Sequence, residues 1–204
     1  MEIKAIETTY SGYKFRSRLE ARWAVFFKEL GLEFEYEPEG FLLDDDVKYL
    51  PDFFLPILSL YVEVKPSGVE LSKSNWKKLN RFGQLKDFLI VFGEPYLQIE
   101  DPCNLGWERH WPITDKKGSE DGGSDSSYVF CVCPWCGKIG VEFDGRGARV
   151  CGYKIHGLSA DEARAAIPGY DGRVDDKIYT YDDPKIVFAA NMSRQARFEH
   201  GECG

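Results

Sequence analysis

Long apolar runs are missing from this chain of 204 residues. No segment approaches the roughly 20 consecutive apolar residues that a membrane-spanning helix needs. The first ten residues, MEIKAIETTY, also lack the basic and apolar regions of a secretory signal peptide. We therefore expect a cytoplasmic protein without a membrane partner.

Positive charge is also in short supply. The chain has 26 Lys and Arg against 34 Asp and Glu, which gives a net charge of −8 and a pI near 5.0. This balance argues weakly against a nucleic-acid partner, because binding phosphates needs local positive charge. A basic patch can nevertheless lie on an acidic protein, and acid clusters that hold a divalent cation would also make the balance negative.

The composition divides the chain into three zones. Residues 1–113 are rich in aromatic and aliphatic side chains, and 43% of the whole chain is hydrophobic, enough for a core. Residues 114–127 are polar and rich in Gly and Ser, which is typical of a flexible linker. Residues 128–204 open with a cysteine cluster. We therefore predict a core domain, a linker and a small C-terminal module.

In the first zone the pattern predicts a helix, three strands, a second helix and a fourth strand. RSRLEARWAVFF, residues 16–27, opens a helix whose large apolar residues share one side and which ends at Gly31. A last helix is predicted from Pro184 to about Glu199. The order indicates an α/β fold with a mixed central sheet flanked by helices. The predicted strands lie in residues 32–41, 49–56, 60–66 and 88–94, and the second helix in residues 72–87.

Acidic side chains and one lysine fall at neighbouring strand positions. Glu63 and Lys65 are two residues apart in a predicted strand, so their side chains project from the same face. Asp52 lies in the preceding strand, and hairpin-like pairing would bring it beside Glu63. Asp52 and Glu63 supply oxygen ligands suited to Mg²⁺. Lys65 could orient an attacking water, act as a base or neutralise the transition state.

Each of these residues also has a structural interpretation. Ser17 and Glu20 fit a capping box at the start of the first helix. Glu63 and Lys65 taken alone are typical of a surface ion pair, and Asp52 could be an ordinary turn residue. Their order and spacing together favour a catalytic set that includes Glu20, while the capping role of Glu20 stays open.

A helix with a glutamate, a Pro-Asp pair and a Glu-x-Lys strand follow one another here, and this order resembles the PD-(D/E)XK nuclease superfamily. The matching residues are Glu20, Pro51-Asp52 and Glu63-Val64-Lys65. The resemblance covers residues 10–95 and implies a restriction-endonuclease-like core that hydrolyses DNA with Mg²⁺ or Mn²⁺. It implies Asp52 and Glu63 as the metal ligands. It further implies Lys65 as the catalytic lysine and Glu20 as an auxiliary acid.

Basic side chains give weaker predictions of DNA contact. Nucleases of this kind often carry polar residues in the helix after the lysine strand, and Lys77, Lys78 and Arg81 lie there. A solvated helix face is the alternative for these three. Arg146 and Arg149 in the C-terminal zone are further candidates for phosphate contacts.

The cysteine cluster has the spacing of a zinc site. Cys133 and Cys136 form a C-x-x-C knuckle, and zinc binds four such ligands in a tetrahedron. Cys151 is the third candidate ligand, and the fourth is Cys131 or His156. Cytoplasmic cysteines are more often thiols or metal ligands than disulfides, so we predict a structural zinc in a small module like a zinc ribbon. A redox pair and unmetallated buried thiols are the alternatives.

These patterns together predict a Mg²⁺- or Mn²⁺-dependent deoxyribonuclease, and the resemblance implies a phage or bacterial setting. DNA is the predicted partner, and nucleases of this type also work as homodimers or within a protein complex. One alternative is a non-catalytic module that binds nucleic acid or protein and retains the nuclease fold. Another is a zinc-stapled interaction protein with an unrelated acidic patch.

Overall fold

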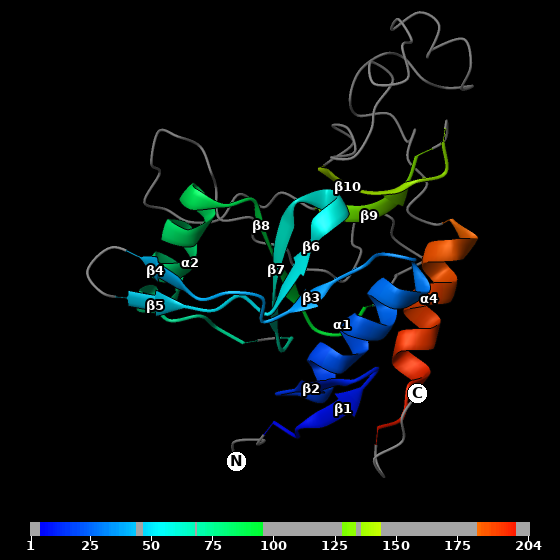
Figure 1. The fold of residues 1–204 in the computed structure, drawn as a ribbon, viewed down its shortest axis with the longest axis horizontal. Helices are drawn as coiled ribbons and strands as arrows, with labels where there is room; N and C mark the ends of the chain where they lie inside the picture. Colours follow the sequence, from blue (N-terminus) through cyan, green and yellow to red (C-terminus); the bar gives the residue numbers. More distant parts are fainter. Residues whose placement is uncertain are drawn as a thin grey trace, which may run out of the picture.

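A four-stranded sheet organises the chain (Figure 1). The structure is a computed structural model, and it describes residues 5–43, 47–67, 69–95, 128–133, 136–143 and 183–198. The strand order is β3-β6-β7-β8, antiparallel except for the parallel pair β7 and β8. The predicted mixed α/β fold is thus confirmed, while its match to a nuclease fold stays a prediction. The strands are β3 (Glu35–Tyr36), β6 (Phe53–Leu55), β7 (Leu60–Lys65) and β8 (Phe88–Phe92).

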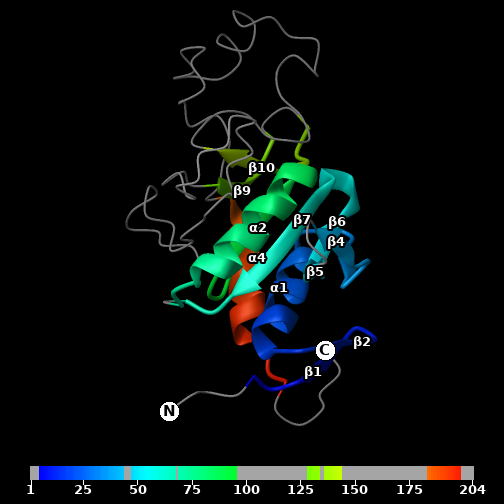
Figure 2. The ribbon, with the colours of Figure 1, turned by 90° about the vertical axis from the view of Figure 1, so that its left-hand side faces the viewer.

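The central strand β7 separates two apolar cores because its side chains alternate between the two faces of the sheet. Val62 and Val64 belong to the core beneath helix α1 (Arg18–Glu29). Tyr61 belongs to the core beneath helix α2 (Lys73–Leu85). Figure 2 views the molecule from the side of α2, with β7 behind that helix. The two helices therefore cover opposite faces of the sheet.

Helix α1 has clear start and stop signals. The Ser17 hydroxyl accepts a hydrogen bond from the Glu20 N–H and caps the first turn. The helix ends at the C-cap Leu30, and Gly31 adopts a φ of +73°, a conformation that costs glycine little. Both ends agree with the sequence prediction.

Helix α1 buries a set of large aromatic side chains against the sheet. Trp23, Phe26 and Phe27 are fully buried. Phe27 meets Phe53 of β6 edge to face, with 5.3 Å between ring centroids. Phe26 meets Phe130 in the same way at 5.4 Å. Aromatic pairs in this geometry add to the free energy gained from burial alone.

Segments from the end of the chain complete the same core. Phe130 belongs to β9 (Tyr128–Val132), which pairs antiparallel with β10 (Ile139–Phe143). Helix α4 (Pro184–Gln195) lies beside α1 (Figure 1) and buries Ile186, Ala189 and Ala190 in that core. The predicted boundaries at residues 113 and 127 lie outside the described residues and stay a prediction.

Several elements differ from the sequence prediction. The strand expected in residues 32–41 is reduced to β3, because Glu37 adopts a φ of +48° and Pro38 offers no N–H to a ladder. Helix α4 ends at Gln195, since Ala196 leaves helical geometry. The first zone also has a short 3₁₀ turn, η2, and two hairpins that were not predicted. They are β1 (Thr8–Tyr10) with β2 (Tyr13–Phe15), β4 (Phe41–Leu43) with β5 (Val47–Tyr49), and η2 (Pro56–Leu58).

Among the described residues, no helix has both the length and the apolar character needed to cross a membrane.

Candidate active site

The register between β6 and β7 brings the two predicted metal ligands together. Phe53 pairs with Val62 in an antiparallel ladder, so Asp52 and Glu63 occupy the next pair of positions along the two strands. The Oδ2 atom of Asp52 accepts the Val64 N–H at 2.7 Å, which holds the carboxyl group against β7. The predicted hairpin-like pairing is confirmed.

Glu63 and Lys65 form an ion pair on one face of β7. The Lys65 Nζ lies 2.5 Å from Oε1 of Glu63. The other oxygen, Oε2, accepts a hydrogen bond of 2.6 Å from the hydroxyl of Tyr49 on β5. The Glu63 side chain is 7% exposed and that of Lys65 is 28% exposed. The lysine therefore lies at the edge of the site, where it can reach solvent or a ligand.

Glu20 makes contacts at the start of α1 and within the network around Asp52. Its Oε1 accepts the Ser17 hydroxyl at 2.7 Å, and its Oε2 accepts the backbone N–H of Arg16 at 3.1 Å. The Tyr36 hydroxyl donates to the same Oε2 at 2.5 Å. The carboxylate thus helps to cap α1. In a capping box it would accept the N–H of the N-cap residue, Ser17, whereas here it accepts the N–H of the residue before it, Arg16. It also belongs to the network around Asp52, so the two roles are compatible.

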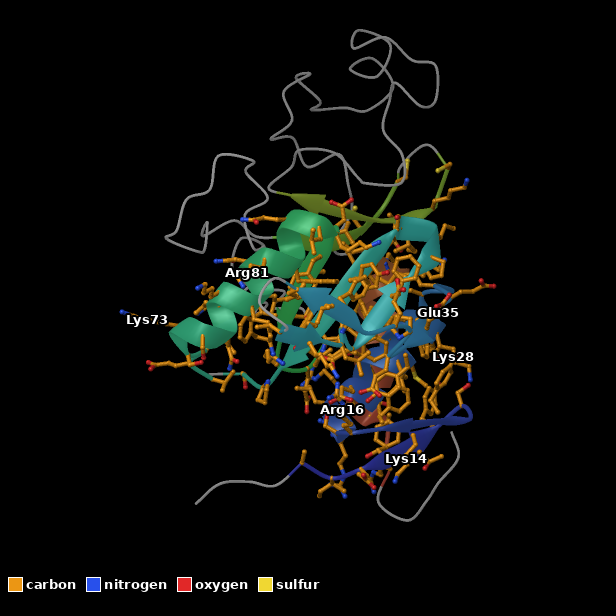
Figure 3. The ribbon with its side chains drawn as sticks, turned by 60° about the vertical axis from the view of Figure 1, so that its left-hand side comes forward. Lys14, Arg16, Lys28, Glu35, Lys73 and Arg81 are labelled. Atoms are coloured by element: carbon orange, nitrogen blue, oxygen red, sulfur yellow. The ribbon has the colours of Figure 1, made fainter. Side chains whose placement is uncertain are left out.

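Arg16 connects the acids, and the sequence interpretation missed it. Its Nη2 lies 2.7 Å from Oδ1 of Asp52, and its Nε lies 2.7 Å from Oε1 of Glu37. In Figure 3, Arg16 lies between the β1–β2 hairpin and the central sheet. Burial opposes charge on the guanidinium, but the contact with Tyr36 and the neighbouring carboxylates raise the pKa above its ordinary value. Arg16 therefore stays positively charged.

The buried acids perturb their neighbours. Burial and the adjacent Glu63 carboxylate raise the pKa of Asp52 from 3.8 to about 8. A backbone N–H and the Lys65 ammonium act in the opposite direction, as does the ion pair with Arg16. Burial and Glu63 also raise the pKa of Tyr49 well above its ordinary value. Tyr49 consequently keeps the proton that it donates to Glu63.

The hydrogen-bonded and ion-paired side chains around Asp52 and Glu63 include more carboxyl groups than cationic groups. Two positive side chains, Arg16 and Lys65, face four carboxyl groups. Once Asp52 has lost its proton, this network carries an excess of negative charge. No three His, Cys, Asp or Glu side chains among the described residues form a ready-made metal cage. Mg²⁺ needs only one or two carboxylates, with water and substrate phosphate as further ligands, so the donor set fits such an ion. The four carboxyl groups are those of Glu20, Glu37, Asp52 and Glu63.

Helix α2 carries the basic residues that were predicted to contact DNA. Lys78 Nζ lies over the ring of Tyr49, 5.3 Å from its centroid, so this lysine is near the Glu63 end of the site. Lys77 is exposed and Arg81 is half-buried. Arg146 and Arg149 lie outside the described residues.

The cysteine cluster is described only in part. Cys131 and Cys133 are buried and Cys136 is exposed. The carbonyl of Cys133 accepts the Gly137 N–H at 2.8 Å, and the Cys133 N–H donates to the Lys138 carbonyl at 2.8 Å. These two bonds join Cys133 to Gly137 and Lys138. The other candidate ligands, Cys151 and His156, lie outside the described residues, so the zinc site stays a prediction.

Comparison with protein-family models, with curated proteins and with solved structures found no match for this chain.

Proposed function

We propose that the chain is a metal-dependent nuclease that hydrolyses DNA phosphodiester bonds. The observation that carries the proposal is the adjacent pair of buried carboxyl groups, Asp52 and Glu63, with the ammonium of Lys65 beside them. Burying two acids side by side is costly unless a cation offsets them. The resemblance of the same residues to the PD-(D/E)XK superfamily supports this interpretation.

Asp52 and Glu63 would hold Mg²⁺ or Mn²⁺. Such an ion, when bound, polarises a phosphodiester and lowers the pKa of a bound water. Since both carboxyl groups are fixed by hydrogen bonds, from the Val64 N–H and from the Tyr49 hydroxyl, they need little reorganisation to act as ligands.

Lys65 and Arg16 supply positive charge at the edge of the carboxyl pair. Lys65 is only partly buried, and its ammonium can hold an attacking water or stabilise charge on the reacting phosphate. The Arg16 side chain is 56% exposed, so its guanidinium can leave Asp52 and contact a phosphate oxygen instead. Glu20 orients the backbone from which Arg16 projects.

One observation favours the alternative of a non-catalytic module. Arg16 and Lys65 already neutralise Asp52 and Glu63 in part. A set of ion pairs of this kind could stabilise a binding domain without any reaction. The two functions differ in whether the chain cleaves DNA when a divalent metal is present.

The test is incubation of the purified chain with linear, circular and branched DNA in Mg²⁺, Mn²⁺ or EDTA. Asp52→Asn keeps the shape of the side chain and its acceptor for the Val64 N–H, and Lys65→Met keeps much of the apolar stem. We expect cleavage by the wild type only with metal, and a loss of roughly 100-fold or more in each variant.

Matched controls separate the chemistry from general effects of charge. Glu33→Gln and Lys48→Met remove one exposed charge of each sign and should cleave like the wild type. Cleavage in EDTA, or full activity in Asp52→Asn, would contradict the proposal. Metal-independent DNA binding without cleavage of any substrate would favour the non-catalytic module.

A further inference from the structure

A cavity of about 620 Å³ lies between the first turns of α1 and the end of α4. Arginines dominate its lining, and they come from segments that are far apart in the sequence. Arg18 and Arg22 project from α1, and Arg194 and Arg197 come from the last turn of α4 and the residues after it. We call this cavity the arginine pocket.

Four guanidinium groups at one cavity are unusual for a chain with a net charge of −8. Glu94 offsets part of this charge through an ion pair with Arg22. A cavity lined mainly by guanidinium groups is suited to an anionic ligand. Guanidinium groups match phosphate oxygens especially well, because their planar N–H groups can donate in pairs.

A purely structural account covers only part of the pocket. Arg194 lies in the last turn of α4, where a cation interacts favourably with the terminal carbonyl groups of a helix. That effect does not explain Arg18 and Arg22, because they lie near the N-terminus of α1. The convergence of both pairs at one cavity is the observation that favours an anion as the ligand.

The arginine pocket is separate from the candidate active site. A step of two residues turns an α-helix by about 200°. Arg18 and Arg22 are each two residues from Glu20, so they project from nearly the opposite side of α1. Since an α-helix with its side chains is about 10–12 Å wide, a ligand that reached both sites would have to be a long polyanion.

We propose that the arginine pocket binds phosphate groups of DNA outside the catalytic centre. The identity of the polyanion rests on the proposed function, whereas the preference for phosphate rests on the four arginines. Arg194 and Arg197 are exposed, so a strand can approach them from solvent. A DNA strand is long enough to span the width of α1 between the pocket and the acids, whereas a mononucleotide is not.

The experiment measures binding of a labelled DNA duplex by fluorescence anisotropy in EDTA, across a range of salt concentrations. The test variant is Arg194→Gln with Arg197→Gln, since both side chains are exposed and the change should leave the fold intact. The matched control is Lys138→Gln with Lys185→Gln, which removes the same charge from exposed positions elsewhere. Thermal unfolding of all three proteins checks that they are folded.

We expect the arginine variant to lose roughly tenfold or more in affinity. The slope of log affinity against log salt should fall by about 2, one unit for each lost phosphate contact. The control pair should change both quantities much less. Equal weakening by the two pairs, an unchanged salt slope, or a wild type that binds no DNA would overturn the proposal. Inorganic phosphate or a nucleotide that stabilises the wild type while the variant still binds DNA normally would overturn the DNA assignment.

Failure of this proposal can be told from failure of the proposed nuclease. If the chain cleaves DNA with metal and its arginine variant binds DNA normally, the proposed nuclease function stands and the proposed role of the arginine pocket is refuted. If the chain cleaves no substrate and its arginine variant loses DNA binding, the proposed role of the arginine pocket stands and the proposed nuclease function is refuted.

Discussion

Asp52 is held between opposing influences at the scale of a single residue. Burial and Glu63 favour its neutral form, while Arg16 and Lys65 favour its charged form. The net effect raises the pKa of this carboxyl group to about 8. Its protonation should therefore influence folding in a range of pH where most carboxyl groups are already ionised.

The first residue-scale prediction concerns the pH dependence of stability. Between pH 3.8 and about 8 the folded chain holds a proton on Asp52 that the unfolded chain has released. Rising pH therefore destabilises the fold through this group, by at most about 1.4 kcal/mol per pH unit. Asp52→Asn removes the proton exchange, so the wild type should lose stability relative to the variant as pH rises through this window.

Chemical denaturation of both proteins in metal-free buffer, at a series of pH values, measures this difference. Glu33→Gln, which removes an exposed carboxylate, shows how far loss of negative charge alone changes the comparison. A gap between wild type and Asp52→Asn that stays constant with pH would refute the raised pKa.

Sequence spacing was sufficient for some contacts of the site and not for others. Glu63 and Lys65 could be paired in advance because residues two apart on a strand share a face. Arg16, Tyr36 and Tyr49 could not, since their partners in the site depend on how a helix, a hairpin and the sheet pack together. A local signal for Arg16 does exist in the sequence. Arg16 directly precedes the helix cap Ser17, so its positive charge lies close in sequence to Glu20.

At the scale of elements, β9 contributes a key side chain to the core beneath α1. Phe130 is 1% exposed and lies among Trp23, Phe26 and Phe27. The centroid distances to these three rings are 6.4, 5.4 and 5.9 Å. The hairpin β9–β10 is therefore part of the same packing as the first helix.

Phe130→Ala should lower the free energy of unfolding by about 3–5 kcal/mol, because it leaves a cavity among aromatic rings. Phe188→Ala is the matched control, since Phe188 on α4 is 54% exposed and its loss should cost about 0.5 kcal/mol or less. Denaturation followed by tryptophan fluorescence measures both. Similar stability in the two variants would mean that β9 is not joined to the core.

The elements that the sequence predicted well are those with strong periodic signals. Helix α1 and strands β7 and β8 have long apolar stripes or continuous apolar runs. The hairpins β1–β2 and β4–β5 have strands of only three residues, too short for a period of two to stand out. Strand β3 was overestimated because alternation continues past Glu37, where the backbone turns away.

At the scale of the whole molecule, described residues that are far apart in the sequence pack together. Phe198 packs edge to face on Tyr10 of β1, with 6.0 Å between ring centroids. Helix α4 lies along α1. Composition predicted a C-terminal zone, but it could not predict this packing. Hydrophobic burial is non-directional, so an apolar residue does not specify which other residue it will contact.

The predicted zinc site would affect the stability of the whole molecule. Strand β9 contains Cys131, a candidate ligand, and Phe130, which is buried in the core beneath α1. We expect one zinc ion per chain by elemental analysis. Cys133→Ser should lose most of this zinc and lower the melting temperature, because the metal would staple the end of the hairpin. Cys103→Ser lies outside the predicted ligands and should keep the zinc. Full zinc content in Cys133→Ser would refute this ligand set.

Arg16 and Lys65 act as built-in counter-ions for the acids at the centre of the molecule. A newly made chain can therefore bury both acids before it meets any divalent ion, because Asp52 keeps a proton up to about pH 8 and the positive side chains lie beside Asp52 and Glu63. Binding of the proposed metal would then be an exchange of partners at a site that is already formed. The exposed Arg16 side chain can move aside in such an exchange without disturbing the sheet. Under the proposed function, the positions of these two cations predict that folding precedes metal binding.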